Sequence, residues 1–256
     1  GLCRNFEDYR LRFGSILGQG SPEVISFKFR QFKKEIILML VRWYLAYALS
    51  YRDVEELALE RGLSVDHSTI NRWVVYYAPK LEEQFRKRHK KKVSGSWRMD
   101  ETYLKVKGKD VYLYRSVDKL GKTIDFLLLE KRDKEAALSF FIKALGQHGF
   151  PEKVTMDKSG ANKAAIDEIN LRLYLLFLLS GIFLHISVRQ NKYLNNLIEQ
   201  DHRHIKRITQ PMQGFKSFAC ARATISGIEL HHMIRKGQHI EAANLSIFDQ
   251  FYQLAA

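Results

Sequence analysis

Cysteine, proline and long hydrophobic runs are scarce in this sequence. Two of its 256 residues are cysteine, Cys3 and Cys220, and four are proline. Two cysteines cannot form a disulfide framework, so we expect a protein of the reducing cytoplasm. The longest apolar run, Leu173–Leu184, has 12 residues, too few to cross a bilayer of about 30 Å at about 1.5 Å per residue. We therefore predict no membrane segment and interpret this run as buried core.

Acidic residues are few relative to basic ones. The chain has 42 Lys and Arg against 28 Asp and Glu, which gives a formal net charge of +14. Such an excess favours a polyanionic partner, with nucleic acid ahead of a membrane surface. The content of 46% hydrophobic and 27% charged residues argues against general disorder, and the length suits one large or two small domains. Residues 1–26 show neither a clear periodicity nor a secretory signal, and we assign them no role.

Three helices are predicted in the first third of the chain. An apolar repeat at helical spacing gives the first, and the second begins after Ser50, with Asp53 placed as in a capping box. Gly62 suits the end of the second helix, and the third runs over His67–Tyr77. Pro79 is predicted to end the third helix, because proline cannot donate a backbone hydrogen bond.

Two short helices joined by a glycine-containing turn are the arrangement of a helix-turn-helix. The outward side chains of the third helix are short polar groups, a histidine and one arginine, which suit base edges and phosphates. We predict that DNA is contacted by His67, Ser68, Thr69, Asn71 and Arg72. The alternative is an ordinary helical hairpin with a solvated face; the basic net charge favours the DNA-binding interpretation.

A run of positive charge separates these helices from the rest of the chain. Arg86–Lys92 carries six basic side chains in seven positions, a pattern typical of a solvated linker that can also neutralise DNA phosphates. Ser94–Ser96 then marks a boundary. We predict an unassigned segment at 1–26, a helix-turn-helix domain at 27–80, a basic linker at 81–96, a catalytic domain at 97–210 and a C-terminal helical extension at 211–256.

The second half of the chain alternates strands and helices. We predict strands at Trp97–Val106 and Val111–Asp118, then a buried central strand at Thr123–Leu129. The remaining elements in chain order are helix Asp133–Leu145, strand Lys153–Asp157, helix Lys163–Leu175, strand His185–Arg189 and helix Asn195–Ile208. This order predicts an α/β fold with a mixed sheet covered by helices, which is the layout of a ribonuclease-H-like core.

Three carboxylates lie where such a sheet could bring them together. Asp100 is in the first strand, Asp157 ends the fourth and Glu199 is on the last helix. Oxygen ligands favour Mg²⁺ or Mn²⁺ over zinc, and two such ions can activate a nucleophile and stabilise the leaving oxygen of a phosphodiester. Each acid also has an ordinary alternative: an exposed strand residue, a helix N-cap and a surface acid, respectively. Three other acids compete for the same role, namely Glu101, Asp118 and Asp125.

The last predicted helix combines this acid with positive charge. Arg203 and Lys206 share the helical face of Glu199, and Arg207 follows, so a metal ligand and cations for the DNA backbone project together. The alternative is an i,i+4 salt bridge on a solvated face. A zinc site is not expected, because the spacing of the nearby candidates matches no standard ligand pattern: His202, His204, Cys220, His231 and His232.

Several long blocks of sequence resemble one protein family. They include VRWYLAYALSYRDVEELALERGLSVDHSTINRWV, WRMDETYLKVKGKDVYLYRSVD, VTMDKSGANKAAI and RQNKYLNNLIEQDHRHIKR. The chain thereby resembles bacterial insertion-sequence transposases of the DDE type, in the group that moves replicatively through cointegrates. The resemblance implies that Asp100, Asp157 and Glu199 are the catalytic, metal-binding carboxylates and that Lys206 contacts terminal DNA. It also implies Mg²⁺ as cofactor, with Mn²⁺ possible, and a location on the nucleoid.

The family chemistry implied by this resemblance has two steps at one site. Water cuts an element end to expose a 3′-OH, which then attacks target DNA. The helix-turn-helix would read the terminal inverted repeats, and a dimer or higher oligomer is expected on DNA, because two ends must be joined.

One departure from the family pattern leaves alternatives open. The stretch between Asp157 and Glu199 is longer than usual, and the extra residues lie around Leu173–Leu184. It is either a tolerated insertion or a change that displaces the metal site. The alternatives to a working transposase are therefore a catalytically inactive relic or DNA-binding repressor, and a nuclease that cuts DNA without joining it.

Overall fold

The computed structural model describes residues 25–28, 31–191 and 196–255, and it divides the chain into two compact units. The described residues of the first unit are 92–103, 111–191 and 196–201. The second unit contains the described residues up to 91, together with 104–110 and 202–255. The strands β1 and β2 and the helix α7 contribute residues to both units. The segment 1–24, to which we assigned no role, lies outside the described residues.

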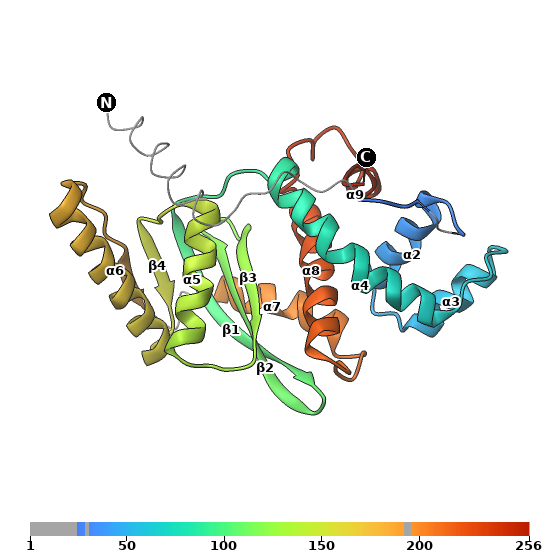
Figure 1. Cartoon of the computed structure of the whole chain (residues 1–256), viewed down its shortest axis with the longest axis horizontal. Coiled ribbons are helices and arrows are strands. Elements are labelled where there is room, and N and C mark those ends of the chain that lie inside the picture. Colours follow the sequence, from blue (N-terminus) through green and yellow to red (C-terminus); the bar gives the residue numbers. More distant parts are fainter. Residues whose placement is uncertain (1–24, 29–30, 192–195, 256) are drawn as a thin grey trace. The chain divides into compact units, whose positions relative to one another are not determined.

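A five-stranded mixed sheet forms the first unit, in the order β3-β2-β1-β4-β5 (Figure 1). β1 and β4 pair in parallel, as do β4 and β5, whereas β2 and β3 are antiparallel. The strands are β1 (Ser96–Val106), β2 (Lys109–Asp118), β3 (Thr123–Leu129), β4 (Lys153–Met156) and β5 (Ser187–Gln190). This order confirms the ribonuclease-H-like mixed sheet predicted from the sequence.

Helices α5 (Lys134–His148) and α6 (Gly160–Ser180) pack on each other, and α5 also packs on β3. Asp133 caps α5 by accepting a hydrogen bond from the amide of Ala136 at 2.8 Å. The core of the unit lies between the sheet and these helices. Its largest side chains are those of Trp97, Tyr114, Phe140 and Phe141.

The prediction that Thr123–Leu129 is a central strand was wrong, because β3 is at the edge of the sheet. Its apolar residues are nevertheless buried, since α5 covers them. Lys143 of α5 binds the Asp125 carboxylate at 2.6 Å and the carbonyl oxygen of Phe126 at 2.7 Å. An edge strand covered by a helix and a central strand paired on both edges can have the same apolar pattern, so the sequence could not distinguish an edge strand from a central one.

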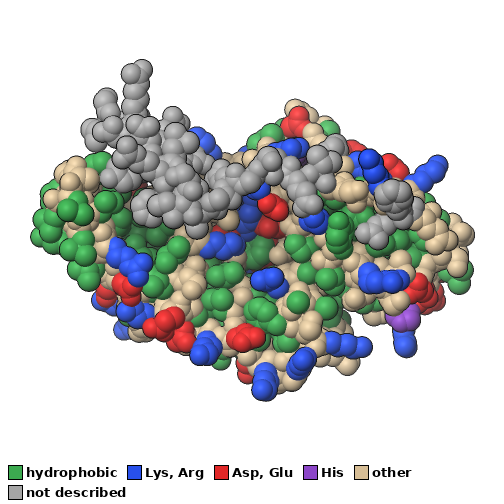
Figure 2. Space-filling model, in the orientation of Figure 1, with side chains coloured by type: hydrophobic (Ala, Val, Ile, Leu, Met, Phe, Trp, Pro, Cys, Tyr) green, Lys and Arg blue, Asp and Glu red, His purple; other side chains and the backbone are tan. Residues whose placement is uncertain are grey.

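The prediction that Leu173–Leu184 is buried core was also wrong. α6 buries Ile166, Ile169 and Leu173, but further along, Leu179 is 87% exposed and Phe183, just after the helix, is 68% exposed. Hydrophobic side chains gather over α6 at the left of the space-filling view (Figure 2). Only the turns of the helix that lie against the sheet and α5 can be buried, and the apolar run continues past them. Among the described residues, no helix is long and apolar enough to cross a membrane.

The second unit is helical. Its helices are α2 (Lys34–Ala46), α3 (Tyr51–Leu59), α4 (His67–Gln84), a π-helical turn (Phe85–His89), the end of α7 (Asn196–Thr209), α8 (Phe218–Arg235) and α9 (Ile247–Gln253). α4 and α8 pack closely together and against α2. Gly227 allows this approach, because a Cβ atom there would lie 2.5 Å from Leu45 and 2.8 Å from Ala78.

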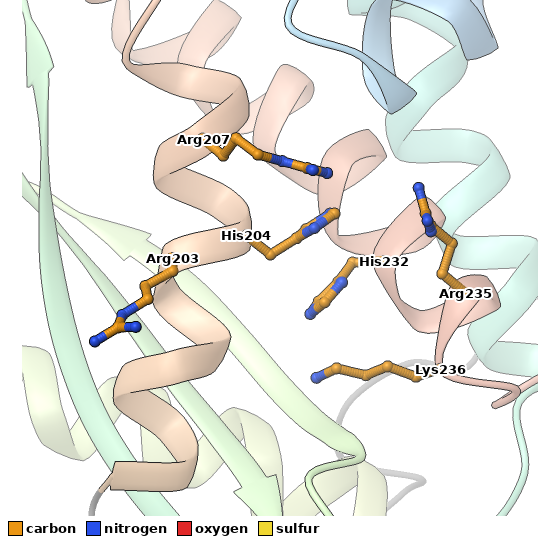
Figure 3. Close-up of a pocket in the computed structure, with 6 residues that line it drawn as sticks. All are labelled: Arg203, His204, Arg207, His232, Arg235 and Lys236. Carbon is orange, nitrogen blue, oxygen red and sulfur yellow. The ribbon is translucent and has the colours of Figure 1, made fainter.

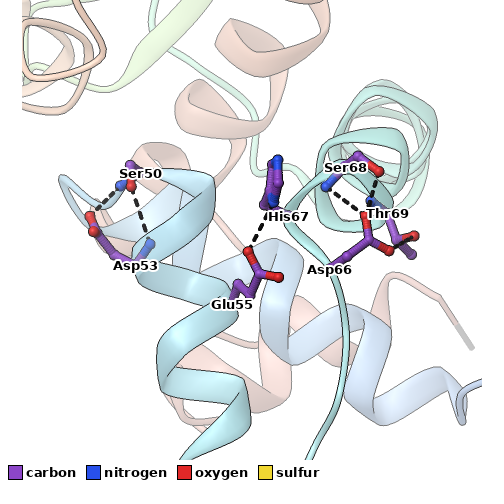
Figure 4. Close-up of polar contacts among 7 residues, drawn as sticks. All are labelled: Ser50, Asp53, Glu55, Asp66, His67, Ser68 and Thr69. Carbon is purple, nitrogen blue, oxygen red and sulfur yellow. Dashed lines mark hydrogen bonds and ion pairs between the residues drawn. The ribbon is translucent and has the colours of Figure 1, made fainter.

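The predicted start and end of α3 are confirmed. Ser50 and Asp53 form a reciprocal capping box, with the Ser50 hydroxyl accepting from the Asp53 amide at 3.1 Å (Figure 4). Gly62 has a φ of +72°, the left-handed conformation that glycine favours after a helix.

The prediction that Pro79 ends the third helix was wrong, because α4 continues to Gln84. A proline inside a helix removes one backbone hydrogen bond, and burial of Ala78 and Leu81 on either side holds the helix together. The basic run therefore begins in helical structure, where Arg86 binds Glu82 and Lys87 binds Glu83 at 2.6 Å. Side chains of Arg86–Lys92 are thus partly neutralised by acids one turn earlier.

Candidate active site

Asp100 and Asp157 occupy equivalent positions on neighbouring parallel strands. Arg98 of β1 is opposite Thr155 of β4; Asp100 lies two residues further along β1, and Asp157 immediately follows the end of β4. Continuing this register would place the two Cα atoms roughly 4.8 Å apart, the spacing between strands. Met99 and Met156, which precede them, are fully buried. Because side chains alternate along a strand, both carboxylates project to the face opposite these methionines.

Glu199 is in the first turn of α7, and the residues around it tie that turn to the sheet. Ile198 is fully buried, and Leu197 lies so close to Gly121 that a Cβ atom there would be 3.5 Å from it. One turn of helix brings Asp201 to Arg115 of β2 with an N–O distance of 2.7 Å. Arg115 is completely buried, so this ion pair anchors the beginning of α7.

The three carboxylates are close enough to affect one another's charge. The pKa of Asp100 is raised from its ordinary 3.8 to about 7. Burial is the largest cause, followed by the negative charge of Glu101; Asp157 and Glu199 also raise it, while a hydrogen bond from the backbone of Glu101 lowers it. The fold therefore places Asp157 and Glu199, which are far from Asp100 in sequence, close enough to it for their charges to raise its pKa.

The competing acids have structural partners of their own. Glu101 binds Arg132 and accepts a hydrogen bond from the Asn162 side chain at 3.0 Å. Asp118 accepts from the backbone amides of the turn between β2 and β3, at 2.8 Å for Leu120 and 2.9 Å for Lys122. Asp125 is bound by Lys143, as described above. These contacts account for Glu101, Asp118 and Asp125 without a metal.

The donor set of Asp100, Asp157 and Glu199 fits a hard divalent cation. All three supply carboxylate oxygens, which Mg²⁺ prefers, and a cation would relieve the repulsion that raises the pKa of Asp100. Asp157 is already oriented, since its Oδ1 accepts a hydrogen bond from the Ser159 amide at 2.9 Å. As placed in the described part of the chain, no three His, Cys, Asp or Glu side chains are gathered tightly enough to hold an ion. The carboxylates would therefore have to move closer together to ligate one.

The predicted DNA-contacting residues of the second unit lie at the beginning of α4 (Figure 4). Asp66 caps this helix: its carboxylate accepts from the amides of Ser68 and Thr69, both at 3.0 Å, and from their hydroxyls. These hydrogen bonds hold the pKa of Asp66 well below its usual range. His67 Nδ1 lies 2.9 Å from Glu55, and Arg72 donates to the Thr69 hydroxyl at 2.7 Å.

This capping network was missed in the sequence, although Asp immediately before a predicted helix is itself an N-cap signal. It fixes the orientation of the polar side chains at the start of α4. It also leaves two acids, Glu55 and Asp66, on the surface that was predicted to meet DNA. The remaining predicted contact, Asn71, hydrogen-bonds Tyr51.

Sequence comparison identifies the family. A family model described as a DDE domain, of the IS240 transposase type, matches residues 94–238, more than half of the chain. The transposase for the insertion sequence-like element IS431mec of Staphylococcus aureus is 43% identical over 211 residues, which covers 82% of this chain and 88% of the relative. The chain belongs to the DDE transposases of insertion sequences.

Further relatives and structures are similar to this DDE transposase. The transposase for element IS257 in transposon Tn4003 of Staphylococcus aureus is also 43% identical over 82% of the chain and 88% of the relative. The HTLV-2 integrase catalytic core domain in complex with magnesium has a TM-score of 0.33 at 16% identity, covering 64% of this chain and 84% of that one. A simian T-cell lymphotropic virus intasome chain has a TM-score of 0.37 at 16% identity, covering 53% and 49%.

In this transposase, the ion pair between Arg115 and Asp201 is the feature of the site that sequence reasoning missed. A signal for it exists: Arg115 lies inside an otherwise buried strand, and a buried charge requires a partner. Asp201 is two residues after Glu199 and is turned toward the sheet. A strand arginine that must be paired therefore fixes where α7 begins, and with it where Glu199 lies.

Proposed function

We propose that this DDE transposase cuts the 3′ ends of an insertion sequence and joins them to target DNA, at a site formed by Asp100, Asp157 and Glu199. The observation that carries the proposal is that Asp157 and Glu199, together with burial and Glu101, which contribute more, raise the pKa of Asp100. The proposal is also supported by the structural partners of the competing acids, since Glu101, Asp118 and Asp125 each accept hydrogen bonds from other parts of the protein. Once they move closer together, the three carboxylates would supply the oxygen ligands that Mg²⁺ and Mn²⁺ prefer.

In this mechanism the residues of the chain bind the metal and hold its ligands in position. When bound, a divalent metal supplies Lewis acidity that activates the attacking oxygen and stabilises the leaving one. In the first step a water oxygen bonds to phosphorus and the bond to the 3′ oxygen breaks, leaving a 3′-OH and a 5′-phosphate. In the second step that 3′ oxygen bonds to a target phosphorus, loses its proton, and displaces the target's own 3′ oxygen. Asp100 and Asp157 are held by the sheet, and Glu199 is held by the anchored first turn of α7.

DNA is the partner in this proposal. The helix-turn-helix domain at 27–80 would read the terminal inverted repeats through the start of α4, while α7 would meet the backbone near the cut. The residues proposed to contact DNA are His67, Ser68, Thr69, Asn71, Arg72, Arg203, Lys206 and Arg207. The basic segment at 81–96 would follow the backbone between that domain and the catalytic domain at 97–210, with 211–256 as a helical extension. Joining two ends requires at least a dimer on DNA.

Strand transfer in Mg²⁺ tests the proposal, using purified protein, labelled element ends and a supercoiled target. Asp157→Asn should abolish the joined product and leave binding of the ends unchanged, because the amide keeps the shape but loses the charge. Asp167→Asn is the matched control, since Asp167 is a half-exposed acid of α6 paired with Lys163 at 2.6 Å. Joined product at the wild-type level in Asp157→Asn would refute the assignment of the site.

An inactive relic or DNA-binding repressor is the second candidate, and the exposed apolar end of α6 favours it. Leu178 and Leu179 are 61% and 87% exposed, and Tyr174 and Leu175 next to them are also exposed, which is an apolar patch of the kind that monomeric proteins rarely leave uncovered. End binding without any cutting or joining by the wild-type protein would support this candidate. Metal-dependent nicking without joining would instead indicate a nuclease.

A further inference from the structure

A hollow of about 440 Å³ in the second unit is lined entirely by basic side chains and imidazoles. Three of the residues come from α7 and two from α8, and the sixth is Lys236, which immediately follows α8 (Figure 3). They are Arg203, His204, Arg207, His232, Arg235 and Lys236. We call this the basic hollow.

A stacked pair of imidazoles joins the two helices at the basic hollow. The rings of His204 and His232 have centroids 3.9 Å apart and an interplanar angle of 13°. In the close-up the two rings point toward one another from α7 and α8, whereas Arg203 points away from them (Figure 3). The stack fixes the distance between the helices, so Arg207 and Arg235 are presented from a rigid frame.

The arginines of the basic hollow have no acidic partner in the described part of the chain. Elsewhere in the same unit, Arg86, Lys87 and Lys105 each pair with a carboxylate. Arg203, Arg207 and Arg235 form no such pair. Guanidinium groups gathered without carboxylates repel one another, and an anionic ligand removes that repulsion.

Two buried side chains near the basic hollow differ in charge, because His231 is neutral and Arg42 is positive. His231 is almost completely buried, and burial, followed by the charges of Arg42 and Arg235 and by His204, lowers its pKa to about 3. Arg42 is itself buried and stacks on the ring of Phe248 at 4.5 Å. The charge of Arg42 acts on His231, which adjoins the lining residue His232, and so adds to the positive charge near the basic hollow.

We propose that the basic hollow binds a backbone phosphate of duplex DNA, with Arg207 and Arg235 as the forked donors on either side of the histidine stack. The inference rests on the proposed function, which makes DNA the partner of α7, and it extends that contact to Arg235 and Lys236 at the end of α8. Guanidinium groups match the geometry of phosphate oxygens, and Lys236 adds a compact charge. The ligand is a phosphodiester of the duplex backbone rather than free phosphate.

The dependence of DNA affinity on salt tests this proposal. Fluorescence anisotropy of the full chain with a short labelled duplex, at about 50 to 200 mM salt, gives a slope of log affinity against log salt of about 0.9 for each phosphate neutralised. Arg235→Gln should lower that slope by about 1, and Arg207→Gln should do the same. Arg222→Gln is the matched control, because Arg222 is an exposed arginine of the same helix outside the hollow.

The outcomes separate this proposal from the function on which it rests. A wild-type slope that is unchanged in both Arg235→Gln and Arg207→Gln would overturn the basic hollow as a DNA site and leave the transposase function standing. A chain that fails to bind DNA even at low salt would overturn the proposed function itself. Arg235→Lys should keep the slope but weaken binding, since it retains the charge and loses the fork. Micromolar binding of inorganic phosphate alone that Arg235→Gln removes, with an unchanged DNA slope, would assign the hollow to free phosphate and overturn the proposal.

Discussion

Replacing Asp100 with asparagine should stabilise the metal-free protein, and it should do so increasingly as the pH rises. The pKa of Asp100 in the folded chain is about 7, against an ordinary value of 3.8. A carboxyl group whose folded pKa is raised contributes stability that is fully present below the unfolded pKa and is lost as the pH rises through the folded pKa. The loss for the wild type therefore falls between about pH 4 and pH 7.

The size of the effect follows from the same two values. A difference of about 3 pH units, at about 1.4 kcal/mol each, gives up to about 4 kcal/mol of destabilisation at about pH 8. Asparagine cannot ionise and has the same shape, so Asp100→Asn avoids this loss. The variant and the wild type should be nearly equal at about pH 4 and differ most at about pH 8.

Amide hydrogen exchange of β1 and β4 measures this difference locally, in EDTA and at matched pH for each comparison. Exchange of these strands should be slower in Asp100→Asn than in the wild type at the higher pH, and Mg²⁺ should slow exchange in the wild type far more than in the variant. Asp167→Asn, which removes one half-exposed surface charge, is the control. A difference between Asp100→Asn and the wild type that is the same at both pH values would refute the reasoning, because it would mean that the pKa of the Asp100 carboxyl is not raised in the folded chain.

The remaining predictions concern stability. Asp201→Ala should lower the free energy of unfolding by about 3–5 kcal/mol, because it leaves the buried Arg115 without its partner; Asp167→Ala, which breaks an exposed pair, should cost no more than about 0.5 kcal/mol. Urea unfolding of the two variants checks this, and equal costs would contradict the anchoring role of the ion pair. Leu179→Gln should change stability by no more than about 0.5 kcal/mol, whereas Ile166→Ala on the same helix should cost about 2–5 kcal/mol. A large loss in Leu179→Gln would mean that the end of α6 is covered.

The elements that the sequence predicted correctly are those whose signals are local. The capping box of Ser50 and Asp53 and the left-handed Gly62 act within a few residues, so they could be recognised without knowledge of the fold. The errors at Pro79 and at Thr123–Leu129 have the opposite origin. Whether a helix survives a proline, and whether a buried strand is central, depends on packing against segments far away in the chain, such as α5 over β3.

The candidate site shows the same division. Sequence order placed Asp100, Asp157 and Glu199 on a plausible sheet, but it could not exclude Glu101, Asp118 and Asp125. The structure separates the two groups of acids by showing the structural partners of Glu101, Asp118 and Asp125. Arg132, Asn162 and Lys143 are 18 or more residues away from the acids that they bind, and no periodic pattern indicates those contacts. The family resemblance, rather than the spacing, made the choice among the six acids.

The segment between Asp157 and Glu199, which we expect to be longer than usual, leaves the sheet and the start of α7 in place. If the extra residues displaced the metal site, β5 would lose its register with β4, or α7 would begin away from the sheet. Neither is the case: Ser187–Gln190 pairs with Lys153–Met156 residue by residue, and the pair of Arg115 and Asp201 ties α7 to β2. The apolar run in which we expect the extra residues continues through the outer turns of α6, where Leu178 and Leu179 are exposed. The segment that most favours an inactive relic thus leaves the register of β5 and the start of α7 in place, which is why strand transfer by the wild-type chain, rather than the length of the segment, must decide between the two.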